Sequence, residues 1–365
     1  MLKAIEKERL TDVYDKIVND KRLSIEDGLR LFNCKDLSAL GFLANIVRER
    51  KNDNKAYYVY NQHINYSNIC INLCAFCAFG KRKNDPQAYE MTIEQAVEKI
   101  KEKKNEPIKE VHIVGGLHPD LPYSYYLDLL KAIKAERPEL HLKAYTCVEI
   151  AHIASIGNKD IENTLKDLID AGLDSMPGGG AEVFSDRIRK KLCPKKIPGS
   201  KWIEIAKTAH NMGIKSNATM LYGHIETYEE RLEHLDALRK AQDETGGFLC
   251  FIPLCFHPKN TALEKRVPYQ TGGIDDLKMI AVSRLMLDNF DHIKAYWIML
   301  GPKISQIALS FGADDFDGTI MEEKITHMAG AETAQAMTKA EIEYLIKQAG
   351  RDPIERDSFY NRVSS

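Results

Sequence analysis

The chain has 365 residues, of which 44% are hydrophobic and 28% are charged, and its 51 Lys and Arg against 53 Asp and Glu leave a formal charge of −2. This composition is typical of a globular, enzyme-sized protein and excludes a disordered or collagen-like chain. No basic excess indicates nucleic-acid binding, and no apolar run reaches the roughly 18 residues of a membrane span, so neither nucleic acid nor a bilayer is an expected partner.

The first 54 residues are predicted to form a helical lead-in. Apolar residues such as Ile5, Leu10, Val13 and Ile17 recur there at helical spacing. The charged N-terminus has no apolar segment of the kind found in secretory signals, so the expected compartment is the cytoplasm.

From Tyr57 onward, strand and helix patterns alternate. Strands are expected near residue 57 and at residues 110–114, 141–146, 173–176, 214–221, 248–254, 293–298 and 314–316. Helices are expected at residues 92–104, 124–136, 161–171, 201–212, 228–243, 276–287 and 304–311, with Ser124 as the N-cap of the second.

Strands that alternate with helices pair in parallel, because each crossover needs a helix to return the chain. Eight strand candidates predict an α/β fold with a closed (β/α)8 barrel of the TIM type over residues 55–320, and a doubly wound open sheet is the alternative. Residues 321–365, with a helix at 338–349, are predicted to form a helical extension that packs on the barrel as a lid or end cap.

In a barrel, chemistry is expected at the carboxyl ends of the strands. The unusual motifs of the sequence follow the predicted strands, at residues 70–77, 115–118, 145–149, 177–182, 217–226 and 256–258. The strand pattern does not depend on these motifs, so the position of the motifs after the strands supports the barrel. His112 lies inside a strand and is expected to be a residue of the barrel interior.

Cys70, Cys74 and Cys77 form a C-x3-C-x2-C cluster. Thiolates are the ligands that iron–sulfur clusters and zinc prefer, and three thiolates on a four-iron cluster leave one iron open to a small molecule. A zinc clip with a distant fourth ligand and three core cysteines are the alternatives. The remaining cysteines have no ligand spacing and are expected to be small core residues.

This spacing, with the aromatic Phe76 before the third cysteine, resembles the radical S-adenosylmethionine (SAM) superfamily. The resemblance implies a 4Fe–4S cluster on Cys70, Cys74 and Cys77, and SAM bound at the open iron and cleaved to a 5'-deoxyadenosyl radical. It also implies an electron donor such as flavodoxin or ferredoxin.

The same resemblance assigns other strand-end residues to SAM. The Gly115-Gly116 turn would approach the methionine amine, although Leu117-His118 stands where this family often has Glu. The glycine-rich residues 177–180 would form a wall of the SAM or substrate site, with Glu182 in polar contact or in a catalytic role. The fifth strand would contact adenine through the backbone or the packing of Met220, Tyr222 and Gly223.

The stretches GGLHPDLP, PGGGAEVF, SNATMLYGHIET and FHPKNT resemble the aminodeoxyfutalosine synthase family of menaquinone biosynthesis. This resemblance implies transfer of the adenosyl group to 3-[(1-carboxyvinyl)oxy]benzoate. The expected substrate or proton-transfer residues are Asn217, Thr219, His118, His257, Arg284 and Lys259. Dehypoxanthine futalosine cyclase and the deazaflavin (FO) synthase subunits are related alternatives, and a metal-clip binding module without catalysis is an alternative from another class.

Overall fold

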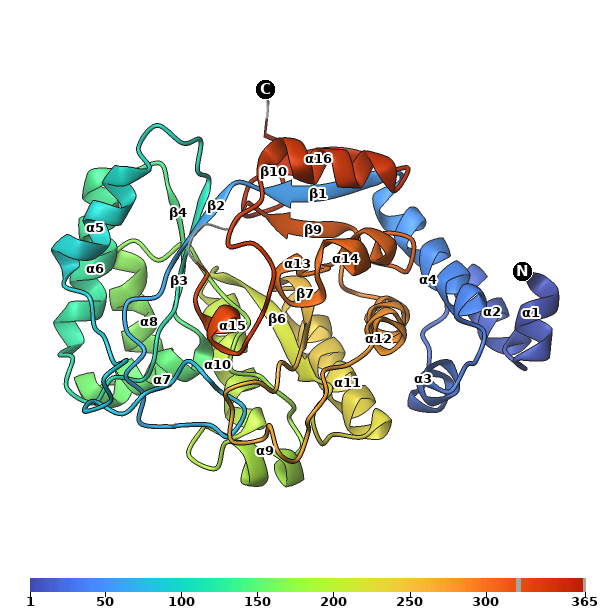
Figure 1. Cartoon of the computed structure of the whole chain (residues 1–365), viewed down its shortest axis with the longest axis horizontal. Coiled ribbons are helices and arrows are strands. Elements are labelled where there is room, and N and C mark those ends of the chain that lie inside the picture. The colour runs from blue at the N-terminus through green and yellow to red at the C-terminus, as the bar shows by residue number, and fades with distance from the viewer. Residues whose placement is uncertain (320–322, 364–365) are drawn as a thin grey trace.

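The computed structural model describes residues 1–319 and 323–363, and it has an α/β fold built around a curved parallel sheet (Figure 1). The predicted boundary between the barrel and the C-terminal segment, at residues 320–321, lies outside the described residues. The division into three segments therefore stays a prediction. In the described part of the chain, no helix combines the length and the apolar character needed to cross a membrane.

Four helices precede the first strand, as the helical spacing predicts: α1 (Leu2–Lys7), α2 (Thr11–Val18), α3 (Ile25–Phe32) and α4 (Leu37–Asn52). Ser24 and Asp27 close the start of α3 with a capping box. The buried side of α4 packs against α12 (Gly273–Met286), so the lead-in is anchored on the outside of the barrel.

The main sheet has seven parallel strands in the order β2-β3-β4-β5-β6-β7-β8. They are β2 (Asn61–Ile64), β3 (Glu110–Ile113), β4 (His141–Ala144), β5 (Ser175–Met176), β6 (Lys215–Tyr222), β7 (Phe248–Cys255) and β8 (His292–Ile293). The order follows the chain without the reversal of a doubly wound sheet, which confirms the TIM-type prediction.

Helices return the chain between these strands on the outside of the sheet (Figure 1). They are α5 (Ile93–Glu102), α6 (Tyr123–Glu136), α7 (Cys147–Gly157), α8 (Ile161–Asp170), α9 (Asp186–Leu192), α10 (Gly199–Asn211), α11 (Tyr228–Thr245) and α12. Because every strand pair is parallel, all the strand-end loops gather at one edge of the sheet.

The strand expected near Tyr57 is split in two at Tyr60. Its first part, β1 (Lys55–Val59), lies between β9 (Asp315–Gly318) and β10 (Asp352–Arg356) in a second parallel sheet. The backbone of Ala295, just after β8, donates to the Asp315 carbonyl at 2.8 Å. Through this bridge and the connection from β1 to β2, the first and last strands of the curved sheet are brought together.

Several local predictions were wrong. The strand predicted at 293–298 ends early, because Trp297–Leu300 form the short helix α13 ahead of α14 (Pro302–Ala308). Ser124 lies inside α6, which starts after Pro122 without a side-chain cap. Helices α7 and α9 were not predicted.

The C-terminal segment contributes more than the predicted helix. Its helices are α15 (Ile325–Met328) and α16 (Lys339–Gln348), and α16 packs against β9, β10 and α14. Strand β10, which was not predicted, pairs with β1 from Lys55 opposite Asp352 to Val59 opposite Arg356. The end of the chain is thus built into the sheet beside the first strand.

Candidate active site

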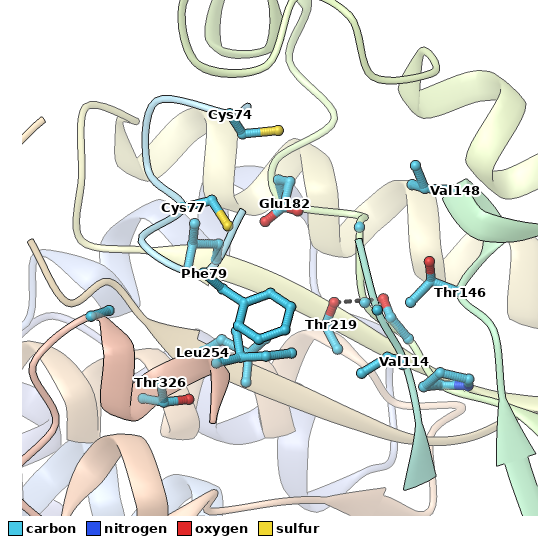
Figure 2. Close-up of a pocket in the computed structure, with 18 of the residues that line it drawn as sticks. Cys74, Cys77, Phe79, Val114, Thr146, Val148, Glu182, Thr219, Leu254 and Thr326 are labelled. Atoms are coloured by element: carbon cyan, nitrogen blue, oxygen red, sulfur yellow. Dashed lines mark hydrogen bonds between the residues drawn. The ribbon is translucent and has the colours of Figure 1, made fainter. Parts of the chain in front are cut away.

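A cavity of about 340 Å³ opens inside the curved sheet, beneath the loops that follow the strands. In Figure 2, Cys74, Cys77 and Phe79 lie on one side of it and Val114, Thr146 and Val148 lie on the other. Residues 325, 326 and 329 of the C-terminal segment also line it, so this segment does reach the cavity. The volume suits a small organic ligand.

The three cysteines of the C-x3-C-x2-C motif face this cavity together. Their loop follows β2 and turns tightly at Leu73, whose φ of 43° lies in the left-handed region. The Gly80 amide donates to Cys77 Sγ at 3.3 Å, which leaves this sulfur with a donor of the kind that stabilises a thiolate. Three soft sulfur donors on one cavity wall fit a 4Fe–4S cluster with one open iron.

The surroundings of the cysteines differ. A side-chain hydrogen bond from Cys193 lowers the pKa of Cys74 to about 7, and the nearby Lys196 ammonium acts in the same direction. Burial raises the pKa of Cys77 to about 11. Cys193 was predicted as a core residue, and it is buried, but it also contacts a predicted cluster ligand.

The glycine turn after β3 lies against the cysteine loop. The Gly116 amide donates to the Ser67 carbonyl at 2.7 Å, and a Cβ on Gly116 would stand 2.2 Å from the carbonyl oxygen of Ile69. Only glycine therefore fits this approach. Gly115 and Gly116 both line the cavity, and their contact with SAM stays a prediction.

Glu149 supports this turn and was not predicted as a site residue. Its buried carboxylate accepts hydrogen bonds from the Gly115 amide at 2.9 Å and from the Tyr66 hydroxyl at 2.8 Å. Burial raises the pKa of Glu149. A local signal existed, because Thr146 and Glu149 have the spacing of a capping box and form one at the start of α7.

Glu182 lines the cavity and is ion-paired. Its carboxylate lies 2.6 Å from Lys196 Nζ, and that ammonium stands 5.2 Å from the centre of the Phe76 ring. Burial alone would lower the pKa of Lys196, but the Glu182 carboxylate together with Cys74 and Cys193 outweighs it, and the pKa is raised. Lys196 is a cation beside the cysteines that the sequence did not predict, because nothing local links it to Cys74.

Strand β6 presents alternate residues to the cavity, as any strand does. Asn217, Thr219 and Leu221 face inward, and Thr219 Oγ1 donates to the Gly178 carbonyl at 2.6 Å. Met220 and Tyr222 face the surrounding helices, where the Tyr222 hydroxyl donates to Asp276 at 2.8 Å. Their side chains therefore do not enter the cavity, and the expected contact with adenine through their backbone or packing stays a prediction. Gly223 does not line the cavity either.

Of the two histidines predicted as site residues, one lines the cavity and the other lies outside it. His257 lines the cavity, with Nε2 3.0 Å from the Met299 carbonyl oxygen. His118 lies outside it, where Nδ1 accepts from the Asp120 amide at 3.0 Å and Nε2 lies 2.6 Å from Glu90. The ring of His118 therefore closes a loop, and the structure corrects its assignment as a substrate or catalytic contact.

Arg284 and Lys259 also lie away from the cavity. Arg284 is fully buried, pairs with Asp314 and donates to the Gly312 carbonyl at 2.8 Å. Lys259 lies at the surface, 2.9 Å from Glu332. Neither side chain contacts the cavity, so both substrate assignments were wrong in position.

The deeper part of the cavity, here called the floor, is polar and lies along the strands below their carboxyl ends. Its residues are Asn61, His63, Glu110, His112, Lys294 and Asp317. His112 is inside the barrel, as predicted, but no pattern in the sequence predicts that these residues lie together. They come from four strand segments far apart in the chain, and only the sheet register makes them neighbours.

Two family models match the chain: the radical SAM superfamily over residues 64–238 and the CofH/MqnC C-terminal region over residues 245–364. The chain is 47% identical to aminodeoxyfutalosine synthase of Thermus thermophilus, over 99% of this chain and 98% of that protein. It is 41% identical to a protein of Methanosarcina barkeri named 5-amino-6-(D-ribitylamino)uracil–L-tyrosine 4-hydroxyphenyl transferase 1, over 93% and 90% of the two chains.

The fold is shared with solved structures. Methylornithine synthase (PylB) superimposes with a TM-score of 0.71 at 20% identity, over 93% of this chain and 96% of the other. The FeFe-hydrogenase maturase HydG from Carboxydothermus hydrogenoformans gives 0.72 at 16% identity, over 97% and 81%. The cysteine loop, the full-length relatives and the barrel agree: the chain belongs to the radical SAM superfamily and is an enzyme that uses a 4Fe–4S cluster and SAM.

Proposed function

We propose that this enzyme is an aminodeoxyfutalosine synthase of menaquinone biosynthesis, working in the cytoplasm. The adenosyl group of SAM would bond to the enol-ether carbon of 3-[(1-carboxyvinyl)oxy]benzoate, and rearrangement onto the arene with loss of the carboxyl carbon would give aminodeoxyfutalosine and methionine. The observation that carries this proposal is the 47% identity to the Thermus thermophilus enzyme along essentially the whole of both chains.

In this proposal Cys70, Cys74 and Cys77 hold the cluster, and the Gly115-Gly116 turn lets the methionine part of SAM approach it closely. When bound and reduced, the cluster supplies the electron that cleaves SAM into methionine and a 5'-deoxyadenosyl radical. The Glu182–Lys196 pair lies beside the cysteines and offers both charges to an α-amino acid group.

The cavity walls suit an aryl substrate. Phe79, Ile252, Leu254 and Phe256 supply apolar surface for a ring and exclude water from a reactive radical. Asn217, Thr219 and His257 stand among these walls as polar contacts. Burial lowers the pKa of His257, so the neutral ring is available to move a proton, and this role stays a prediction.

An acidic electron carrier, flavodoxin or ferredoxin, is the proposed reductant. Two basic segments, residues 81–83 and 190–195, contact the cysteine loop through their backbones: the Cys70 amide donates to the Lys81 carbonyl at 3.0 Å and the Ala75 amide to the Leu192 carbonyl at 2.8 Å. Lys190 and Lys191 are exposed there. In a chain of net charge −2, this local positive surface favours a negatively charged partner.

The test is an anaerobic assay of the reconstituted enzyme with reductant, SAM and 3-[(1-carboxyvinyl)oxy]benzoate, followed by mass spectrometry. We expect an adduct that retains the adenosyl group, together with methionine. Release of 5'-deoxyadenosine without an adduct would contradict the proposed reaction. A His257→Ala variant with full cluster content should turn over more slowly, and an unchanged rate would remove His257 from the mechanism.

A second candidate is the reaction named for the archaeal relatives, supported by their 41% identity over 93% of this chain. The same assay therefore includes a parallel reaction with L-tyrosine and 5-amino-6-(D-ribitylamino)uracil. A product from this pair alone would favour the second candidate. The futalosine cyclase, a further alternative, is tested by supplying its own substrate.

A further inference from the structure

We propose that His63 and His112 form a binding site for the ring carboxylate of an aryl substrate at the floor of the cavity. This inference rests on the proposed function, because it takes the substrate to be a substituted benzoate. It goes beyond that function because it names the residues that bind the ring carboxylate, at the end of the substrate away from the reacting enol ether.

The two rings form one unit on neighbouring strands. His63 of β2 and His112 of β3 are directly opposite each other in the parallel register. Their ring centres lie 4.6 Å apart with an angle of 30° between the planes. Both line the cavity, and His63 is only 7% exposed.

Both rings retain unused hydrogen-bonding capacity. None of the hydrogen bonds formed within residues 1–319 and 323–363 involves either imidazole, although His63 is buried and buried polar groups in proteins nearly always have a partner. The other buried histidines of the chain do have one: His210, for example, lies 2.8 Å from both Thr245 and Ser216 hydroxyls. Two unpartnered imidazoles that open into one cavity indicate a ligand with hydrogen-bonding atoms.

The permanent cations near the cavity are already neutralised. Lys294 pairs with Asp317, and Lys143 lies 2.6 Å from Glu110. Lys196 is held by Glu182 in the same way. A carboxylate that entered the floor would therefore meet no free lysine among the described residues, and the imidazoles are the groups left to receive it.

The charge on the pair sets how it would bind an anion. Burial lowers the pKa of both histidines, and for His112 the neighbouring His63 acts in the same direction, so the neutral form of the pair is favoured. The charged groups that face the pair oppose one another: Glu110, Asp317 and Glu323 favour protonation, whereas Lys143 and Lys294 disfavour it. A bound carboxylate adds a negative charge, and its binding should therefore draw a proton onto the pair.

The test is calorimetry of the cluster-loaded enzyme with 3-hydroxybenzoate as the probe, at pH 7.5, in two buffers that differ in ionisation enthalpy. We expect the probe to bind with net proton uptake, and 3-hydroxybenzyl alcohol, which lacks the carboxylate, to bind more weakly and without uptake. Binding of the acid without proton uptake, or equal binding of the alcohol, would overturn the proposal without any variant.

Variants then show whether the proton uptake comes from His63 and His112. His63→Gln and His112→Gln keep a hydrogen-bonding side chain but cannot take a proton, so each should weaken 3-hydroxybenzoate binding roughly tenfold to a hundredfold and reduce the uptake. His210→Gln, a buried histidine outside the cavity, is the matched control and should change neither. Iron content and melting temperature show whether each variant is folded.

The two proposals fail separately. If the probe binds with uptake that the histidine variants lose, but no adenosyl adduct forms from the substrate, the carboxylate site stands and the synthase reaction is wrong. If the adduct forms and the variants bind the probe as tightly as the unmodified enzyme, the reaction stands and the histidine site is wrong.

Discussion

Replacing Gly116 by alanine should displace the cysteine loop and weaken its hold on the cluster. The added Cβ would stand 2.2 Å from the carbonyl oxygen and 2.8 Å from the carbonyl carbon of Ile69, and 3.0 Å from Cys70 Cβ. Because Cβ atoms do not approach other heavy atoms closer than 3.0 Å, the gap must open by at least 3.0 − 2.2 = 0.8 Å. The obstructing atoms belong to the backbone, so no side-chain rotation relieves the contact.

The cost of this change follows from the contact. Gly116 is not among the residues with positive φ, so alanine can adopt its backbone conformation and the effect is steric. An added carbon in a packed site costs about 1–3 kcal/mol. If the loop moves to relieve it, the cluster is held roughly 5- to 150-fold less tightly, at 1.4 kcal/mol per factor of ten.

Gly80→Ala is the matched control for this experiment. Its Cβ would lie 3.5 Å from Cys70 Cβ and 3.7 Å from Cys77 Sγ, which are ordinary contacts beside the same cysteines. Iron and acid-labile sulfide are measured per chain after anaerobic reconstitution and again after a timed challenge with an iron chelator. Gly116→Ala should lose its cluster faster than Gly80→Ala, and equal retention by the two variants would refute the reasoning.

Three further predictions test other parts of the structure. Lys196→Met leaves a carboxylate buried without its partner and should lower the free energy of unfolding by about 3 kcal/mol in urea denaturation; an unchanged midpoint would contradict this. Charge reversal of Lys190 and Lys191 should slow cluster reduction by flavodoxin hydroquinone at low salt but not by dithionite, and equal slowing with both reductants would count against a docking surface. Glu323 raises the pKa of His327 to about 9, so this pair should stabilise the fold fully below pH 6.5 and lose its effect as the pH rises from 6.5 to 9; melting temperatures of His327→Gln should lack that part of the pH dependence.

The sequence predicted the parts of the site that depend on local spacing. The three cysteines and the Gly115-Gly116 turn were found because each motif lies within a few residues and follows a predicted strand. Parallel strands bring such motifs to one edge of the sheet, so their gathering required only the order of the strands.

The sequence of β6 contained a signal for which of its side chains face the cavity. Polar Asn217 and Thr219 alternate with apolar Ala218 and Met220. A barrel that encloses a polar cavity turns the polar set inward, and the structure shows this arrangement. The resemblance to other enzymes drew attention to Met220, which faces the helices outside.

The floor of the cavity could not be predicted from local patterns. His63 and His112 are 49 positions apart and become neighbours only through the register of β2 on β3. The Lys294–Asp317 pair likewise depends on strands at the end of the barrel. Long-range pairing of this kind leaves no periodicity in the sequence, because each residue alone resembles an ordinary polar residue in a strand.

The names of the relatives do not decide which substrate this cavity takes, so the choice has to be argued from the residues of the cavity. Two proteins with different reaction names match this chain at 47% and 41% identity over nearly its whole length. An amino acid such as tyrosine brings its own ammonium group and needs little charge from the enzyme. A benzoate with a second carboxylate brings two negative charges, and the proposed site at His63 and His112 would receive its ring carboxylate with uptake of a proton. Calorimetry with L-tyrosine and with 3-[(1-carboxyvinyl)oxy]benzoate should therefore show proton uptake for the dicarboxylate alone, and uptake of equal size for both ligands would mean that His63 and His112 do not select the substrate.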